Sequence, residues 1–221
     1  MQNQKAQKPR SITLTSGHIK ELAKDCERLN IRGSVTLHQE IHLKEISTHG
    51  FSTFHSHVAA DLLKSSGSCV IKGNCEVKEI INAGNLKMKN VRAAKLSSSG
   101  KLTIEQMLHS EHLDSIGLIT VKEIHTKHFQ LKLSGESRIN RLITDTAFIE
   151  KDRKSISLKK KLICQFIKGR QLQLAYTDAE IVEGDVVDVG SQCNIQTLTY
   201  TKSCTISPNA KVQQIIRSEN P

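Results

Sequence analysis

The chain has 221 residues, and its 37% hydrophobic content is enough for one large domain or two small ones. With no Trp, 2 Tyr and 5 Phe, its core must consist of Ile, Leu and Val, which argues against a large aromatic-lined cofactor pocket. A formal net charge of +10 allows attraction to anionic partners, but the lack of stacking aromatics and of a recognition helix argues against nucleic-acid binding.

The first residues of the chain are polar and basic. Residues 1–11 include Lys5, Lys8 and Arg10 and lack the apolar core of a signal peptide, so we predict a disordered tail there and a second one at residues 217–221. No stretch reaches the ~20 apolar residues that a membrane span needs. These observations predict a cytoplasmic protein.

Residues 17–30 have a pattern of their own. Ile19, Leu22, Ala23 and Cys26 recur at helical spacing, so this segment could form a capping helix. Such a helix would block one end of the fold and limit assembly to dimers.

Glycines recur along the chain at intervals of 16 to 18 residues. The series is Gly17, Gly33, Gly50, Gly67, Gly84, Gly100, Gly117 and Gly135. Apolar residues follow most of these glycines at two and four places, as Leu86 and Met88 do, which is the period of a strand. A second apolar cluster follows about eight to thirteen places after each glycine, so each unit holds two or three short strands.

Such a unit cannot bury its apolar face alone, so neighbouring units must stack and pair their backbones. We therefore predict an all-β fold, a single-stranded β-helix (β-solenoid) over residues 12–216 with coils of about 17 residues. Roughly twelve coils would give a rod about 55 Å long. The glycines from Gly33 to Gly135 are predicted at the coil corners, where glycine adopts positive φ without a Cβ clash.

The glycine series lapses in residues 150–170, where Asp152 holds the expected place, and it resumes at Gly169 and Gly184. Less regular coils are expected in this stretch. It is also basic, with Arg153 and Lys154 followed by three consecutive lysines, Lys159, Lys160 and Lys161. A solvated coil face is one interpretation, and peripheral contact of this basic face with the inner, anionic face of a membrane is the other.

Chemical motifs are sparse. All ten histidines lie between His18 and His128. His55 and His57 would put two imidazoles on one strand face, but no regular set of carboxylates or thiolates accompanies them as metal ligands. Stacked surface histidines are the favoured interpretation, because similar distances from the preceding glycine are shared by His42, His109 and His125 and by His112 and His128.

The six cysteines contain no C-x-x-C pair and are interpreted as reduced, mostly buried side chains. No P-loop, dinucleotide-binding, G-x-S-x-G or H-E-x-x-H motif occurs. We therefore assign no catalytic, cofactor-binding or metal-binding residue, and we expect a protein that is not an enzyme.

Three stretches carry a family resemblance: INAGNLKMKNVRAAKLSSSGKLTIEQ (residues 81–106), SIGLITVKEI (residues 115–124) and EGDVVDVGSQCNIQTLTYTKSCTISPNAKVQQII (residues 183–216). In their recurring Gly-x-apolar-x-apolar coils they resemble the bactofilins, bacterial polymer-forming cytoskeletal proteins. The resemblance implies a right-handed β-helix, nucleotide-independent filaments and a role in scaffolding cell-shape, envelope or motility machinery and its protein partners. Repeats fill nearly the whole chain here, and residues 1–10 are not the apolar membrane-targeting start of some members.

A β-helix ends in coils whose backbone groups are unpaired unless capped, so we expect the chain to bind itself end to end. The predicted contacts are Ile12, Leu14 and Ile19 in the first coil and Ile206, Val212 and Ile215 in the last. Like ends would give a filament without polarity, and unlike ends a polar one. The alternatives are a non-polymerising β-helix adaptor that binds a protein partner, and a carbohydrate-active or acyltransferase β-helix enzyme.

Overall fold

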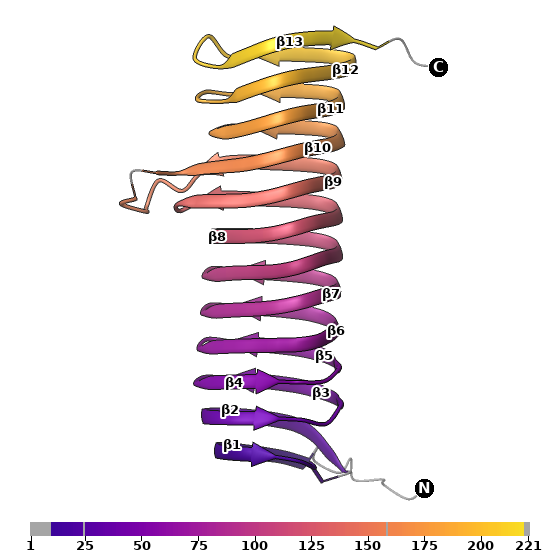
Figure 1. Cartoon of the computed structure of the whole chain (residues 1–221), viewed down its shortest axis with the longest axis vertical. Coiled ribbons are helices and arrows are strands. Elements are labelled where there is room, and N and C mark those ends of the chain that lie inside the picture. The colour runs from indigo at the N-terminus through magenta and orange to yellow at the C-terminus, as the bar shows by residue number, and fades with distance from the viewer. Residues whose placement is uncertain (1–9, 24, 158, 219–221) are drawn as a thin grey trace, which may run out of the picture.

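The computed structural model describes residues 10–23, 25–157 and 159–218, and these form a parallel β-solenoid (Figure 1). The described residues contain thirteen strands and no helix. The strands are β1 (Arg10–Ile19), β2 (Cys26–Leu37), β3 (Ile41–Thr48), β4 (Phe51–Phe54), β5 (Val58–Ser65), β6 (Ser68–Asn82), β7 (Asn85–Ser98), β8 (Lys101–Leu133), β9 (Glu136–Lys151), β10 (Lys161–Leu174), β11 (Thr177–Val189), β12 (Asn194–Ile206) and β13 (Lys211–Arg217).

Every strand pairing is parallel, and each coil pairs with the coil before it and the coil after it. Ser68 pairs with Asn85 and Asn85 pairs with Lys101, so the coil length agrees with the predicted value of about 17 residues. The chain crosses the front of the stack in one direction, returns behind it and rises as it does so, which makes the coil right-handed (Figure 1). The predicted fold class is confirmed.

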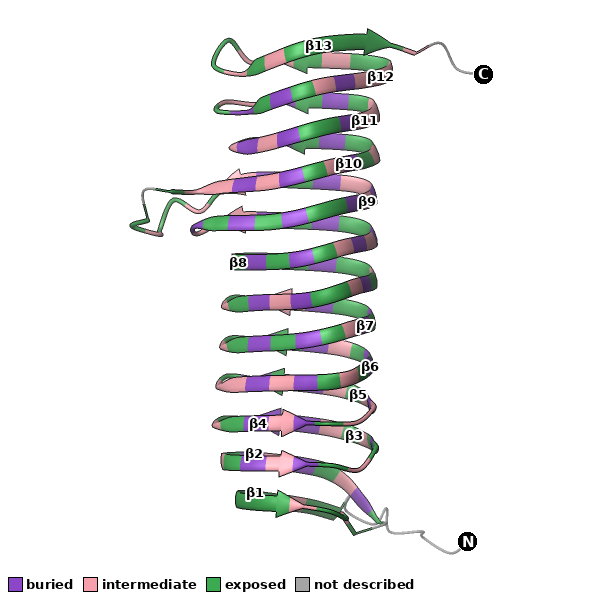
Figure 2. Cartoon of the chain, viewed as in Figure 1, coloured by how far each residue is buried: buried purple, intermediate pink, exposed green. Residues whose placement is uncertain are grey.

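Each complete coil has three pairing segments, as β7 shows. Residues 85–88, 90–93 and 95–98 pair separately with the coil above, and we call them the first, second and third segments of a coil. Each sends two side chains inward: Leu86 and Met88, Val91 and Ala93, Leu96 and Ser98. Within each segment, buried residues alternate with more exposed ones, and the alternation breaks at the corners (Figure 2). The core is therefore a continuous column of mainly aliphatic side chains along the axis, as the aromatic-poor composition requires.

The corner glycines have a different cause from the predicted one. Of the seven glycines from Gly33 to Gly135 in the series, only Gly117 has a positive φ in the left-handed range, at 150°. At Gly84 an added Cβ would lie 2.1 Å from the carbonyl oxygen of Gly67, one coil below. Most of the other corners have the same close approach, so glycine is needed there because successive backbones meet too closely for a Cβ.

The predicted capping helix is wrong. Among the described residues of the 17–30 segment, β1 continues to Ile19 and β2 begins at Cys26, with an irregular connection between them. Within this connection the backbone N–H of Leu22 donates to Oε1 of Gln39 at 3.1 Å. The apparent helical spacing arises because Ile19 and Cys26 end and begin strands, and backbone pairing with the neighbouring coil overrides local propensity. The described residues hold no helix that could cross a bilayer.

The irregular stretch that the glycine lapse indicates is a loop between β9 and β10. Ser137 of β9 pairs with Leu162 of β10, a separation of 25 residues where other coils have 15 to 18. The extra residues leave the stack sideways and form a projection from one side of the rod (Figure 1). The coils on both sides of the loop keep their register, so the core passes the insertion without a break.

Candidate functional site

The two ends of the rod have incomplete backbone pairing. Within the described part of the chain, β1 pairs only with β2, and β13 pairs only with β12. Each end therefore presents one strand edge whose N–H and C=O groups have no neighbour in the sheet. These two edges are the candidate functional site.

At the N-terminal end, the three predicted contact residues lie in β1 and are partly exposed. Ile12, Leu14 and Ile19 pair with Leu29, Ile31 and Leu37 of the next coil, respectively. All three partners are 0% exposed. The β1 side chains therefore belong to the inward columns of the core, and they are half-covered because only one side has a neighbouring coil.

The C-terminal end has the same character. Val212 and Ile215 of β13 pair with Ile195 and Leu198 of β12, which are 0% exposed, whereas Ile215 is 51% exposed. Ile206 pairs with the fully buried Val189 on one side. Because β13 ends at Arg217, no described strand covers residues 203–206, the third segment of the last coil.

The two ends are complementary in phase. Following the pairings coil by coil places Ile19 and Val212 in one inward column and Leu14 and Ile206 in another. In β1, residues 10–14 form a third segment and residues 16–19 form the first segment of the next coil. In β13, residues 211–212 form a first segment and residues 214–217 a second segment. β13 stops after a second segment, so a second copy placed on the C-terminal end would begin with the third segment, the next one in the coil.

The histidines form columns on the surface, as the sequence indicates. The ring centroids of His109 and His125 are 4.9 Å apart, and those of His112 and His128 are 4.7 Å apart. His55 stacks on His38 at 4.5 Å, whereas His57 lies against His42 at 5.7 Å. His55 and His57 therefore join two different columns and do not share a strand face. Among the described residues, no three His, Cys, Asp or Glu side chains are placed so that they could hold a metal ion.

The cysteines are unpaired, and all but Cys204 are buried. Burial raises the pKa of Cys69 to about 11 and that of Cys164 to about 12. A thiol with such a pKa is almost entirely protonated at neutral pH and is a poor nucleophile. These cysteines act as small core side chains.

The basic stretch of the sequence gathers around the loop between β9 and β10. Arg153, Lys159, Lys160 and Lys161 line an open hollow of about 930 Å³ on the side of the rod, and Lys154 does not. Sequence reasoning identified these cations but not the hollow, because the hollow depends on how far the extra residues leave the stack.

Comparison with known proteins leaves the chain without an assigned family. No protein-family model matches it, and no solved structure matches it. A segment of 56 residues is 34% identical to the uncharacterized protein YhbF of Bacillus subtilis strain 168. The alignment spans 25% of this chain and 24% of that protein, about a quarter of each.

Proposed function

We propose that this chain is a structural, polymer-forming scaffold protein that assembles end to end without nucleotide. The observation that supports the proposal is the state of the two terminal coils. Each combines an unpaired strand edge with aliphatic core side chains that are covered on one side only. A second molecule can pair with the free strand edge of a terminal coil and cover its core side chains, because its own terminal coil has the same kind of edge and the same inward columns.

The energetics favour assembly that depends on concentration. Completing the burial of six half-exposed aliphatic side chains contributes about 1 kcal/mol each, less than full burial would. The cost of association is ~4–15 kcal/mol, so these side chains alone offset little more than its lower limit. The backbone hydrogen bonds of the new ladder must supply the rest, and partners that raise the local concentration would promote growth.

The phase of the ends favours head-to-tail assembly. In that arrangement Leu14 of one copy continues the inward column that ends at Ile206 of the other, and Ile19 continues the column of Val212. All strands stay parallel across the junction, as they are throughout the rod. The resulting filament is polar. A cytoplasmic filament of this kind would serve as a scaffold for cell-shape, envelope or motility machinery.

Electron microscopy of the purified protein without nucleotide tests the proposal. We expect filaments at tens of micromolar protein, and we expect Leu14→Glu to abolish them because it places a charge in the junction. Ile116→Glu is the matched control, since Ile116 is 46% exposed in the middle of the rod, away from both ends. Monodisperse wild-type monomers would contradict polymerisation and favour a non-polymerising adaptor.

A further inference from the structure

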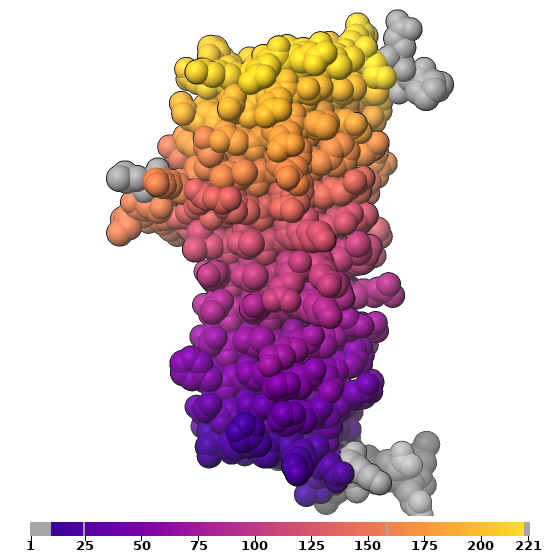
Figure 3. All heavy atoms as spheres, in the orientation of Figure 1, coloured from indigo at the N-terminus to yellow at the C-terminus, as the bar shows by residue number. Residues whose placement is uncertain are grey.

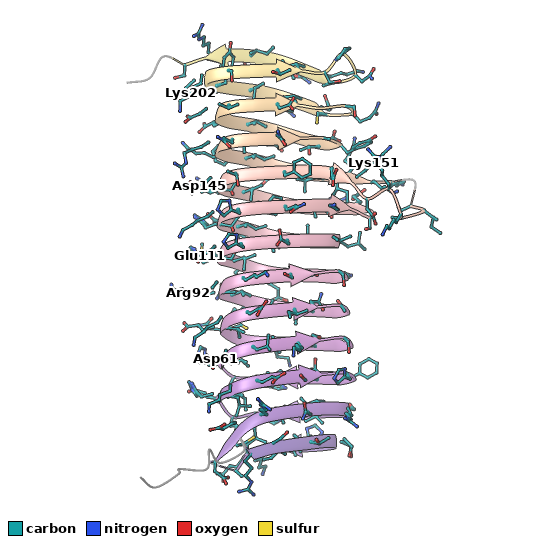
Figure 4. All side chains as sticks on the ribbon, turned by 180° about the vertical axis from the view of Figure 1, so that it is seen from behind. Asp61, Arg92, Glu111, Asp145, Lys151 and Lys202 are labelled. Carbon is teal, nitrogen blue, oxygen red and sulfur yellow. The ribbon has the colours of Figure 1, made fainter. Side chains whose placement is uncertain are left out.

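The hollow beside the β9–β10 loop has an unusual charge balance. Of the charged side chains that line it, five are cationic and one, Glu136, is anionic. The cationic residues are Lys151, Arg153, Lys159, Lys160 and Lys161. Lys151 lies where the loop leaves the stack (Figure 4).

Most of this positive charge is not neutralised within the chain. Lys161 Nζ is 2.6 Å from Asp178 Oδ2. Glu136 forms an ion pair with Arg138, whose Nη2 lies 2.5 Å from Glu136 Oε1. Within the described residues, Lys151, Arg153, Lys159 and Lys160 have no carboxylate oxygen within 4.0 Å. Asp152 is the remaining nearby carboxylate, and it accepts hydrogen bonds from the Ser134 hydroxyl and the Lys154 backbone N–H.

Several cations on the opposite edge of the rod are paired with carboxylates, in contrast to those of the hollow. There Lys78 Nζ lies 2.6 Å from Asp61, Lys202 Nζ lies 3.1 Å from Asp185, and Arg170 pairs with Asp145 at 2.9 Å. Figure 4 shows Asp61, Asp145 and Lys202 along that edge, away from Lys151. These three pairs neutralise each other between neighbouring coils, and Arg92 is a cation on that edge without a carboxylate of the described residues within 4.0 Å. The hollow instead gathers four such cations around one cavity, which favours the binding of an anion there.

The floor of the hollow contains two side chains at strained backbone positions. Tyr176 and Gln192 occupy equivalent corners of successive coils with φ of 54° and 60°. Glycine would adopt these angles without strain, whereas Tyr and Gln do so at a cost in free energy. Lys151 Nζ lies 5.1 Å from the centroid of the Tyr176 ring, which holds this cation over the floor.

The loop itself is tethered and carries an exposed aliphatic side chain. The Ser155 hydroxyl donates to the carbonyl oxygen of Ser134 at 2.7 Å, and Lys160 Nζ donates to that of Asp152 at 2.8 Å. Ile156 is 99% exposed beside these cations. The loop projects from the side of the rod, where end-to-end contact does not cover it (Figure 3).

We propose that this hollow binds the phosphate of an anionic phospholipid headgroup and that Ile156 enters the adjoining acyl boundary. Lys151, Arg153 and Lys159 would contact the phosphate oxygens, and Tyr176 and Gln192 would supply hydrogen-bonding groups at the floor. Cations attract an anionic headgroup surface, and one exposed aliphatic side chain beside them adds apolar contact. The site would hold the rod, as a monomer or as a filament, with one side against a membrane.

Vesicle sedimentation tests this site with the full chain. We expect binding to phosphatidylcholine vesicles that contain phosphatidylglycerol and none to pure phosphatidylcholine. The triple variant Lys151→Ala, Arg153→Ala, Lys159→Ala should lower the partition coefficient about 100-fold, since each cation contributes about fivefold. Ile156→Ser should lower it about fivefold. Deleting residues 152–159, which returns the β9–β10 spacing to 17 residues, should match the triple variant.

The matched control is the triple variant Lys72→Ala, Lys89→Ala, Lys122→Ala, which removes the same charge from exposed lysines elsewhere on the rod. It should lower binding only a few-fold. Equal losses in the two triple variants, or no binding to anionic vesicles, would overturn the proposal. Thermal stabilisation by inorganic pyrophosphate that only the site variant abolishes, without vesicle binding, would assign the hollow to a soluble phosphate instead of a lipid.

Discussion

At the scale of single residues, the backbone contact between successive coils accounts for the glycine series. The carbonyl oxygen of Gly67 lies where a Cβ of Gly84 would be, and Gly84 stands in the same relation to Gly100. The blocking atom is a backbone carbonyl oxygen, which any residue one coil below would supply, as Thr15 does below Gly33, so each of these corners needs glycine independently of its neighbours. Gly135 differs, since the atom nearest to its added Cβ is Cδ2 of Leu118, the end of a flexible side chain, at 2.7 Å.

This difference predicts unequal costs for the same substitution. Gly84→Ala should lower the free energy of unfolding by about 1–3 kcal/mol, because the backbone of two coils must separate. Gly135→Ala should cost less, because Leu118 can change rotamer. Chemical denaturation followed by circular dichroism measures both variants. Equal losses would show that backbone approach does not decide which corners need glycine.

At the scale of elements, imidazoles on neighbouring coils lie in contact, and we predict that acid destabilises the rod through them. Burial, followed by the charges of Lys72 and the stacked His38 and His18, lowers the pKa of His55 below its usual value of 6.5. Burial and then the neighbouring His125 lower the pKa of His109, with Arg92 acting in the same direction and Glu123 against it. The folded state therefore holds these rings neutral at a pH where the unfolded chain takes up protons.

The direction of the pH effect follows from this difference. The stability that neutral His55 and His109 provide is complete above pH 6.5 and is lost as the pH falls from there through the folded pKa values. The melting temperature should fall between pH 7.5 and pH 5.5, above the range in which the paired carboxylates titrate. In the double variant His55→Gln, His109→Gln the melting temperature should fall less than in the wild type. In the control His49→Gln, which lies outside these columns, it should fall as much as in the wild type. An unchanged fall in the double variant would contradict this origin.

The elements also show how far the sequence could be read. The solenoid, its coil length and the site of the irregular loop follow from the glycine spacing and the period-2 pattern, because these repeat along the chain. The apolar spacing after Gly17 indicates a possible helix and the structure has none there, because that spacing is local whereas the pairing of β1 with β2 is not. The hollow near Lys159 could not be derived, because it depends on the path of a loop without a repeat.

At the scale of the whole molecule, the ends decide what the rod can do. The six predicted contact residues all continue core columns, because a repeat pattern fixes which side chains point inward even in a terminal coil. Which end meets which could not be predicted from the repeat, because that depends on the segment at which each terminal strand begins and stops. The described bounds of β1 and β13 give these segments, and the proposed head-to-tail contact rests on them.

Cysteine cross-linking tests head-to-tail assembly. In parallel, in-register coils about 4.8 Å apart, Leu14→Cys and Ile206→Cys on adjacent copies lie within disulfide range. In a Cys204→Ser background, a mixture of the two single variants should give covalent dimers under mild oxidation, and neither variant alone should. Dimers from each single variant alone would show that like ends meet. The remaining native cysteines are buried, and the background protein controls for their reactivity.

The sideways projection between β9 and β10 gives an assembled filament a consequence that the isolated rod lacks. In the proposed filament each subunit would add one basic projection per subunit length, whereas on the opposite edge three acid–base pairs neutralise each other (Figure 4). Growth of such a filament would therefore multiply the proposed weak membrane contacts along one side of it. A short oligomer would dissociate readily from an anionic membrane, whereas a long filament would stay bound. The strength of membrane binding would therefore increase with filament length.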